Sequence, residues 1–204
     1  KHSFIRSLLV TVEMYLHHKI LKIYQKNIDQ YLCPSHFLSS KLVEWGLPKN
    51  KLKTIPHCLD TKKYQPDFTL GDYFLFFGRL DQEKGVDKLV QAMAQVPDKK
   101  LKIVGFGPEY KKIQALIKHH KLENRIELVG PKYDDELKEI IRRSYAIVVP
   151  SQWYEVFGLV NLEAAALGKL VIAADIGGIP EVVKDQQTAL LFNPQSVTDL
   201  ASKL

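Results

Sequence analysis

The sequence predicts an α/β fold in which a parallel sheet is covered by helices on both faces. Short, almost continuously apolar segments recur along the chain, as expected for strands buried on both sides. Segments with apolar residues at helical spacing alternate with them, for example around Leu89, Val90 and Met93. Of the 204 residues, 46% are hydrophobic and 25% are charged, which is ordinary for a globular protein and excludes a disordered chain.

The chain is predicted to begin with a basic amphipathic helix that extends to about residue 28. Its first 30 residues hold five Lys or Arg against two acidic residues, a net charge of +3. One side of this helix is apolar through Leu8, Leu9, Met14, Tyr15, Ile20, Leu21 and Tyr24. We interpret it as a helix packed on its own domain, and contact with anionic lipid remains an alternative.

The next segments predict short elements and then a linker. A strand is expected at 30–33, followed by a helix that Ser35 caps and Gly46 ends. A second strand is expected at 52–55. Proline and glycine interrupt both patterns in residues 58–71, which are therefore predicted to form a linker.

From residue 72 onward strands alternate with helices. Strands are predicted at 73–77, 101–104, 126–129, 146–149, 170–173 and 189–192. A helix at 159–167 follows the fourth of them, and Ser196 with Asp199 begins a last helix as a capping box. Ligands of parallel sheets bind beyond the carboxyl ends of the strands, where four residues fall: Arg79, Gly105, Gly130 and Glu155.

Two glutamates, Glu155 and Glu163, flank the start of the predicted 159–167 helix with seven residues between them. The free N–H groups near Gly158 and the positive end of this helix would favour a phosphate. One carboxylate can reach a group bound in front of these amides, and the other a group beside the helix. Sugar hydroxyls are suitable partners for both carboxylates, although most glutamates are only solvated charges.

A loop with two cations follows the first strand of the predicted large sheet. It contains Gly78, Arg79, Lys84 and Gly85. The Arg79 guanidinium could bind oxygens of a diphosphate bidentately, and Lys84 could act as a point charge. Gly78 lets the backbone approach a ligand, and Gly85 opens the next helix.

Five motifs in this order resemble those of the retaining glycosyltransferases of group 1, which have the GT-B fold and use nucleotide-diphosphate sugars. The motifs are Gly78-Arg79-Leu80 with Glu83-Lys84-Gly85, Gly105-Phe-Gly-Pro-Glu109, Pro150-Ser151 through Glu155, Phe157-Gly158-Leu159 with Glu163, and Gly177-Gly178-Ile-Pro180-Glu181. The resemblance implies a Rossmann-like donor domain at 72–204, a linker at 58–71, and at 1–57 the last part of a Rossmann-like, acceptor-binding domain. We therefore expect the sequence to be a piece of a longer enzyme.

The resemblance also implies a role for individual residues. Arg79 and Lys84 would bind the donor diphosphate, Glu163 the ribose hydroxyls, and Glu155 the donor sugar, with Glu155, Arg79 and Lys84 forming the catalytic set. The backbone at Gly78, Gly105, Phe157, Gly158 and Leu159 would contact the donor, and the loop Gly130-Pro131-Lys132-Tyr133 would hold the base. The acceptor would be a glycan or a lipid-linked sugar, and no cofactor or metal is expected. Where the family usually has Asn-Gly, this chain has His57-Cys58, and Ala189 replaces a common glycine.

Other classes of protein fit less well. Only two cysteines occur, Cys33 and Cys58, which favours packing roles and a reducing, cytoplasmic compartment. The lipid contact considered for the basic helix would place the protein peripherally at the inner face of the membrane. No apolar stretch reaches the roughly 18 residues that span a bilayer, and no nucleic-acid-binding motif is present. A dinucleotide-binding oxidoreductase is disfavoured because the segment 105–110 lacks the third glycine of its fingerprint. A non-catalytic nucleotide-binding or regulatory module stays open.

Overall fold

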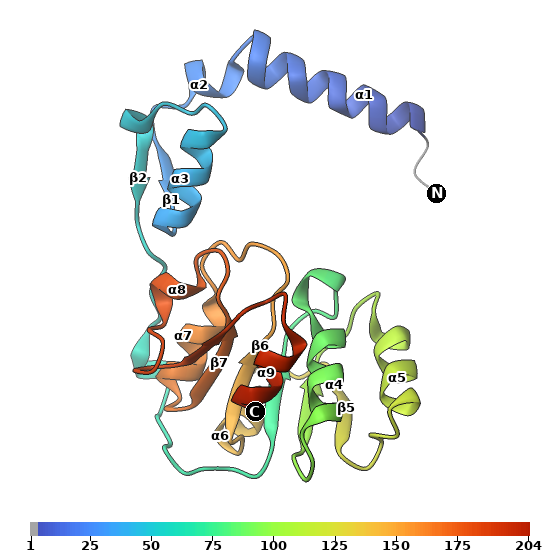
Figure 1. The fold of residues 1–204 in the computed structure, drawn as a ribbon. Coiled ribbons are helices and arrows are strands. Elements are labelled where there is room, and N and C mark those ends of the chain that lie inside the picture. Colours follow the sequence, from blue (N-terminus) through green and yellow to red (C-terminus); the bar gives the residue numbers. More distant parts are fainter. Residues whose placement is uncertain (1–3) are drawn as a thin grey trace. The chain divides into compact units, whose positions relative to one another are not determined.

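The structure of the protein is a computed structural model that describes residues 4–204 (Figure 1). The chain forms two compact units, of which the first ends at Pro56 and the second comprises His57–Leu204. The net charge of +6 is divided very unevenly between the two stretches of sequence. Residues 1–56 contain nine Lys or Arg against three acidic residues, whereas residues 57–204 contain twenty of each and are neutral.

The first unit begins with three short helical segments instead of the single helix predicted to residue 28. These are α1 (Phe4–Tyr15), the π-helical turn η1 (Leu16–Ile20) and α2 (Ile23–Asn27). The helix breaks at Lys22, which adopts the left-handed conformation with φ of +51°. The Lys51 ammonium holds the end of α2, because it donates to the carbonyls of Gln25 (2.7 Å) and Ile28 (2.8 Å).

The rest of the first unit follows the predicted order closely. Strand β1 (Tyr31–Cys33) pairs in parallel with β2 (Leu52–Thr54), and α3 (His36–Glu44) with the 3-10 turn η2 (Lys49–Lys51) connects them. Ser35 caps α3 as predicted, because its hydroxyl accepts a hydrogen bond from the Leu38 amide (3.1 Å).

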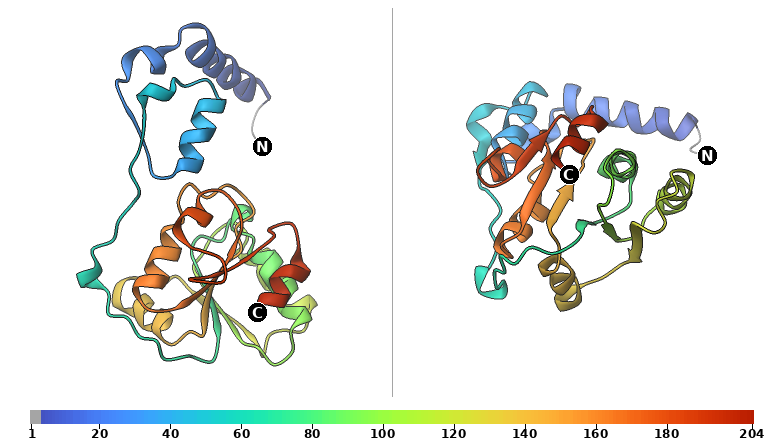
Figure 2. Two further views of the ribbon diagram at one scale, coloured as in Figure 1. Left: turned by 60° about the vertical axis from the view of Figure 1, so that its left-hand side comes forward. Right: turned by 60° about the horizontal axis from the view of Figure 1, so that its bottom comes forward.

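The second unit is built on a six-stranded parallel sheet, as predicted (Figures 1 and 2). Its order is β5-β4-β3-β6-β7-β8, with every neighbouring pair parallel. All six predicted strands are present, and each of their ends lies within one residue of the expected position. They are β3 (Phe74–Phe77), β4 (Leu101–Val104), β5 (Ile126–Gly130), β6 (Ala146–Val149), β7 (Leu170–Ala174) and β8 (Leu190–Phe192).

Helices cover both faces of this sheet, again as predicted (Figure 2). One face is covered by α4 (Val86–Gln95), α5 (Tyr110–His119) and α9 (Val197–Lys203). The other is covered by α6 (Asp134–Arg142), α7 (Leu159–Ala166) and the short α8 (Ile179–Val182). Strand β3 shows why its sequence is continuously apolar: Phe74 and Phe76 enter the first core, and Leu75 and Phe77 enter the second.

Residues 58–71, predicted as a linker, contain the 3-10 turn η3 (Thr61–Lys63) and contact the second unit, where the Lys169 ammonium donates to the Thr69 carbonyl (2.7 Å). Two local predictions differ from the structure. Only half of the predicted capping box forms: Ser196 accepts from the Asp199 amide, but Asp199 accepts from the Asn193 amide. Cys58 is exposed, so the expected packing role applies to Cys33 alone.

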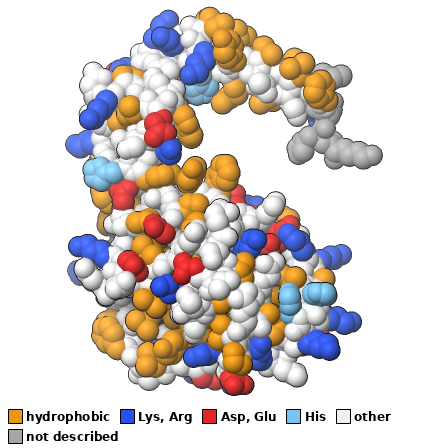
Figure 3. All heavy atoms as spheres, viewed as in Figure 1, with side chains coloured by type: hydrophobic (Ala, Val, Ile, Leu, Met, Phe, Trp, Pro, Cys, Tyr) orange, Lys and Arg blue, Asp and Glu red, His pale blue; other side chains and the backbone are white. Residues whose placement is uncertain are grey.

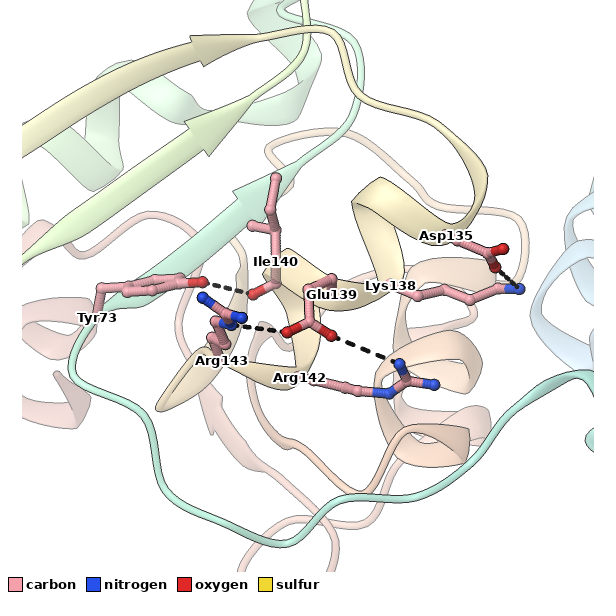
Figure 4. Close-up of polar contacts among 7 residues, drawn as sticks. All are labelled: Tyr73, Asp135, Lys138, Glu139, Ile140, Arg142 and Arg143. Atoms are coloured by element: carbon pink, nitrogen blue, oxygen red, sulfur yellow. Dashed lines mark hydrogen bonds and ion pairs between the residues drawn. The ribbon is translucent and has the colours of Figure 1, made fainter.

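The carboxyl end of α6 is held by a side chain from the start of β3 (Figure 4). The Tyr73 hydroxyl donates a 2.7 Å hydrogen bond to the Ile140 carbonyl, one of the last carbonyls of α6, which lack partners within the helix. Burial raises the pKa of Tyr73 to about 12. In the same turn Glu139 lies between Arg143 (2.7 Å) and Arg142 (3.6 Å). These contacts fix the end of α6 at the amino end of β3, opposite the carboxyl edge of the sheet.

Candidate functional site

A pocket of about 500 Å³ lies at the carboxyl ends of β3 and β6. These two strands are the point where the strand order of the sheet reverses, and ligands of open α/β sheets bind at such a point. We call it the switch-point pocket. Its lining residues are His57, Phe76, Phe77, Gly78, Arg79, Glu83, Lys84, Val148, Val149, Ser151, Tyr154, Glu155, Val156, Phe157, Gly158, Leu159 and Val160.

Three glycines pack side by side where β3, β4 and β5 end. Gly78 donates to the Val104 carbonyl (3.0 Å), and Gly105 donates to the Gly130 carbonyl (2.9 Å). A Cβ atom on Gly105 would lie 1.9 Å from the Gly78 carbonyl oxygen, so no larger residue fits there. Gly105 does not line the pocket; it packs against the backbone of Gly78, which does.

Arg79, the first predicted cation, enters the pocket from the loop after β3. Its guanidinium forms a two-point contact with the Asp81 carboxylate, with Nε–Oδ2 at 2.7 Å and Nη2–Oδ1 at 3.1 Å. The Arg79 side chain is 74% exposed and that of Asp81 is 17% exposed, so water reaches the guanidinium and a ligand can compete for it. A diphosphate could take the place of Asp81 on the same donors.

The second cation, Lys84, contacts the first of the two glutamates directly. Lys84 Nζ lies 2.6 Å from Glu155 Oε1, and the Ser151 hydroxyl donates to the same oxygen at 2.9 Å. The sequence analysis predicted separate ligand contacts for Lys84 and Glu155, and it did not predict that they would bind each other. The backbone supports this arrangement, because the Gln152 amide donates to the Glu83 carbonyl (2.8 Å).

The amino end of α7 forms one wall of the pocket. Gly158 precedes the helix in a left-handed conformation with φ of +91°, and no side chain caps its free N–H groups. A Cβ atom on Gly158 would lie 2.5 Å from Asn161 Nδ2. Asn161 is fully buried, and neither polar atom of its side chain has a hydrogen-bond partner among residues 4–204. The Gly178 amide fixes the preceding loop by donating to the Glu155 carbonyl (2.7 Å).

Glu163, the second glutamate, lies on α7 outside the set of residues that line the pocket. It is partly buried, and this burial raises the pKa of its carboxyl group. No hydrogen bond or ion pair within the described residues offsets the cost of its charge. The Glu163 charge also adds to the burial that raises the pKa of the Tyr64 hydroxyl. The Glu163 carboxylate is thus a partly buried acceptor without a donor, and a pair of hydroxyl donors would stabilise its charged form.

The predicted base-binding loop lies apart from the residues of the switch-point pocket. Gly130 ends β5, and Pro131 and Tyr133 are exposed. The Lys132 ammonium pairs with Glu136 in the first turn of α6. None of these loop residues lines the pocket, so a ligand that reaches both must extend along the carboxyl edge from β6 past β3 and β4 to β5.

His57 is a pocket residue whose role the sequence analysis missed. Its ring contacts the edge of Phe157, with centroids 5.3 Å apart at an interplanar angle of 84°. The replacement of the usual Asn-Gly pair by His57-Cys58 was the available signal, because it puts an aromatic side chain at a position where an asparagine is expected. Ser151 was noted only as part of a motif, and its hydrogen bond to Glu155 required the structure.

Comparison with known proteins agrees with this fold. Residues 62–204 match the family model of glycosyl transferases group 1, and the chain belongs to this family. An uncharacterized glycosyltransferase of Methanocaldococcus jannaschii is 35% identical over 180 residues, which are 87% of this chain and 49% of that protein. The gpi3 subunit of phosphatidylinositol N-acetylglucosaminyltransferase from Schizosaccharomyces pombe is 29% identical over 91% of this chain and 42% of its own length.

Solved structures with similar folds are GT-B glycosyltransferases. Sucrose-phosphate synthase from Thermosynechococcus elongatus superposes with a TM-score of 0.78 at 29% identity, over 90% of this chain and 50% of that one. HepE from Anabaena, solved in complex with UDP and glucose, gives a TM-score of 0.81 at 23% identity, over 89% and 54%. The chain spans about half the length of the curated relatives it matches.

Proposed function

We propose that the second unit binds the nucleoside diphosphate of a nucleotide sugar and that the complete protein transfers the sugar to an acceptor hydroxyl. One observation carries this proposal. Two exchangeable cations, Arg79 and Lys84, and the uncapped amino end of α7 line the same pocket at the reversal point of the sheet. All three favour an anion with several oxygens.

Donor binding in this proposal requires an exchange of partners. Arg79 would leave Asp81 and Lys84 would leave Glu155, and both would bind diphosphate oxygens. Glu155 would then be free to accept hydrogen bonds from the donor sugar. Glu163 would accept from the ribose hydroxyls, and the backbone of 130–133 would hold the base. Neither a cofactor nor a metal is part of this scheme.

The chemistry that these residues would supply is stabilisation of the leaving diphosphate. In a retaining transfer the acceptor hydroxyl attacks the anomeric carbon from the face that the diphosphate leaves, the diphosphate takes the electrons of the broken C–O bond, and the hydroxyl proton passes to the departing diphosphate oxygen. Arg79, Lys84 and the α7 amides would balance the charge that develops there. Glu155 would orient the sugar.

The relatives support a nucleotide-sugar donor and suggest classes of acceptor. HepE was solved with UDP and glucose, and the gpi3 protein is a subunit of a phosphatidylinositol N-acetylglucosaminyltransferase. We therefore propose a glycan or lipid-linked acceptor in cell-surface polysaccharide or glycolipid synthesis. The protein would act in the cytoplasm or at the inner face of the membrane, and its first unit would make any contact with lipid.

Calorimetry with UDP, GDP, ADP and NAD, each with excess chelator, tests the donor proposal. We expect one nucleoside diphosphate to bind without divalent metal, because cations of the chain and the α7 amides supply the positive charge. The matching nucleoside monophosphate should bind more weakly, since it lacks one phosphate. If NAD binds best, or if diphosphate binding disappears with the chelator, the proposal fails.

A further inference from the structure

A second hollow lies beside the switch-point pocket, and of its lining residues only Arg79 has a role in the donor scheme. Its volume is about 720 Å³, and its lining residues are Arg79, Asp81, Gln82, Glu83, Gln152 and Trp153. We call it the Trp153 hollow. It shares Arg79 and Glu83 with the switch-point pocket, so the two cavities are neighbours along one wall.

Trp153 is the most conspicuous residue of this hollow. Its side chain is 65% exposed, and its ring lies 5.7 Å from that of Tyr154, which lines the switch-point pocket. The loop that carries it is held in place by the preceding residue, Gln152, through two hydrogen bonds. The Gln152 amide donates to the Glu83 carbonyl (2.8 Å), and the Gln152 side chain donates to the Pro150 carbonyl (3.0 Å). A large aromatic ring on an anchored loop is presented to a ligand at low entropic cost.

The polar lining of the hollow favours a neutral ligand with many hydroxyl groups. Its lining has one cation, Arg79, against two carboxylates, Asp81 and Glu83, so it is net negative and disfavours a phosphate; when a donor diphosphate takes Arg79, both carboxylates remain. The carboxylates and the two glutamine amides, Gln82 and Gln152, offer both acceptors and donors for hydroxyl groups. An apolar ring face beside such groups matches a pyranose, which has C–H bonds on its face and hydroxyls at its rim.

We propose that the Trp153 hollow binds a pyranose ring of a glycan acceptor, stacked on the Trp153 indole. This inference rests on the proposed function. The shared wall at Arg79 and Glu83 places such a ring next to the donor pocket, where an acceptor has to be held for transfer. The site would select acceptors that carry a sugar over acceptors that present only a lipid.

The chain offers a matched pair of fluorescent reporters for a test. It has two tryptophans, Trp45 in the first unit and Trp153, and both are 65% exposed. Trp45→Phe leaves Trp153 as the reporter, and Trp153→Phe leaves Trp45. Each variant is titrated with glucose, galactose, mannose, N-acetylglucosamine and maltotriose, with and without saturating UDP. We expect at least one sugar to change the Trp153 fluorescence saturably and the Trp45 fluorescence not at all.

Substitutions of Trp153 then test whether the sugar stacks on its ring or only binds near it. Trp153→Ala should weaken binding of the sugar that responds by about tenfold, measured by calorimetry, and Trp153→Tyr should retain most of it, because a stacking face remains. UDP affinity should be unchanged in both variants. Absence of a saturable change at Trp153 with all five sugars overturns the inference, as does equal loss of UDP binding in Trp153→Ala. Failure of UDP to bind the unsubstituted protein would instead refute the proposed function.

Discussion

The candidate site depends, at the level of single residues, on ion pairs within the protein that a ligand would have to replace. Lys84 is bound to Glu155, and Arg79 is bound to Asp81. Both pairs keep cations oriented at the pocket: Arg79 is largely exposed, whereas Lys84 and Glu155 are 30% and 22% exposed, so a ligand that takes Lys84 has to supply oxygens in place of the Glu155 carboxylate. Glu163 has the opposite character, because its charge is partly buried without a partner.

Removal of either cation should weaken nucleoside diphosphate binding. We expect Arg79→Ala and Lys84→Ala each to weaken binding of the preferred nucleoside diphosphate, UDP or GDP, by about 1.5–3 kcal/mol, the value of a hydrogen bond to a charged group. Lys100→Ala is the matched control, because Lys100 also pairs with an exposed carboxylate, that of Asp72, away from the pocket. Unchanged affinity in both pocket variants by calorimetry would show that these are solvated loop charges.

Glu155 should matter for the sugar and not for the diphosphate. Glu155→Gln releases Lys84, so the affinity for free UDP or GDP should stay equal or increase. In the complete enzyme the same substitution should strongly reduce sugar transfer, measured with a radiolabelled donor. If the complete, unsubstituted enzyme binds the donor but transfers no sugar to any acceptor, the protein is a non-catalytic nucleotide-binding module.

Glu163 links function to stability with a defined pH dependence. Burial raises its pKa in the folded state, so the folded protein loses stability as the pH rises from the ordinary glutamate pKa through this raised value. Glu163→Gln should therefore raise the melting temperature at pH 7, and this gain should shrink as the pH falls from the raised pKa of Glu163 to the ordinary glutamate pKa and be absent below it. The same variant should bind UDP or GDP less tightly. A melting temperature that is lowered at pH 7 would contradict this account.

Among the elements, the start of α7 shapes the pocket, whereas the end of α6 is fixed at the opposite edge of the sheet. Gly158 turns the chain into α7 with a positive φ and lies against the Asn161 side chain. Tyr73 connects the start of β3 to the last turn of α6. The first contact should therefore affect the site and the second the stability of the fold.

Gly158→Ala should destabilise the protein and distort the pocket wall. The left-handed backbone costs alanine about 1–2 kcal/mol, and the contact with Asn161 Nδ2 adds to this. Gly130→Ala serves as a control for stability, because its φ is +81° and a Cβ atom there would meet no atom within 4 Å. Urea unfolding should show a greater loss for Gly158→Ala, which Gly158→Ala/Asn161→Ala should reduce to the control value. Equal losses in the two single variants would exclude a steric role for Asn161.

Tyr73→Phe should lower the free energy of unfolding by about 1–2 kcal/mol. The substitution removes the hydrogen bond and leaves the Ile140 carbonyl without its donor. UDP or GDP affinity should change little, since neither residue lines the pocket. A stability equal to that of the unsubstituted protein in urea unfolding would mean that water replaces the tyrosine hydroxyl.

For the molecule as a whole, charge and apolar exposure are concentrated in the first unit. Its sequence accounts for the whole net charge of +6, and many apolar side chains of α1 are exposed (Figure 3). None of the described helices is long and apolar enough to cross a membrane. A basic surface with apolar side chains suits the contact with anionic lipid that we propose for this unit.

Sedimentation with vesicles that contain phosphatidylserine tests this contact. We expect binding that decreases with added salt and that weakens by roughly 1 kcal/mol for each lysine removed in Lys19→Gln/Lys22→Gln/Lys26→Gln. Lys99→Gln/Lys100→Gln/Lys102→Gln removes the same charge from the neutral second unit and should bind as before. Equal binding to neutral vesicles, or equal weakening by both triple variants, would refute a specific contact through the first unit.

The sequence by itself determined the large sheet, its parallel strands and the carboxyl edge that carries the candidate site. These features depend on local patterns: continuous apolar strands, helical spacing, and glycines such as Gly78 and Gly105 at strand ends. The break at Lys22 escaped prediction because the amphipathic pattern continues through it, and the stabilising contacts come from Lys51, distant in sequence.

Tertiary structure alone decided which side chains meet in the site. Lys84 and Glu155 are 71 positions apart, and their contact depends on how two loops are fixed on neighbouring strands, which no local pattern encodes. For the same reason His57 enters the pocket, whereas Glu163, only eight positions from Glu155, does not line it. Residue type and spacing indicate the chemistry that is available, but the packing of loops around the sheet decides which groups act together.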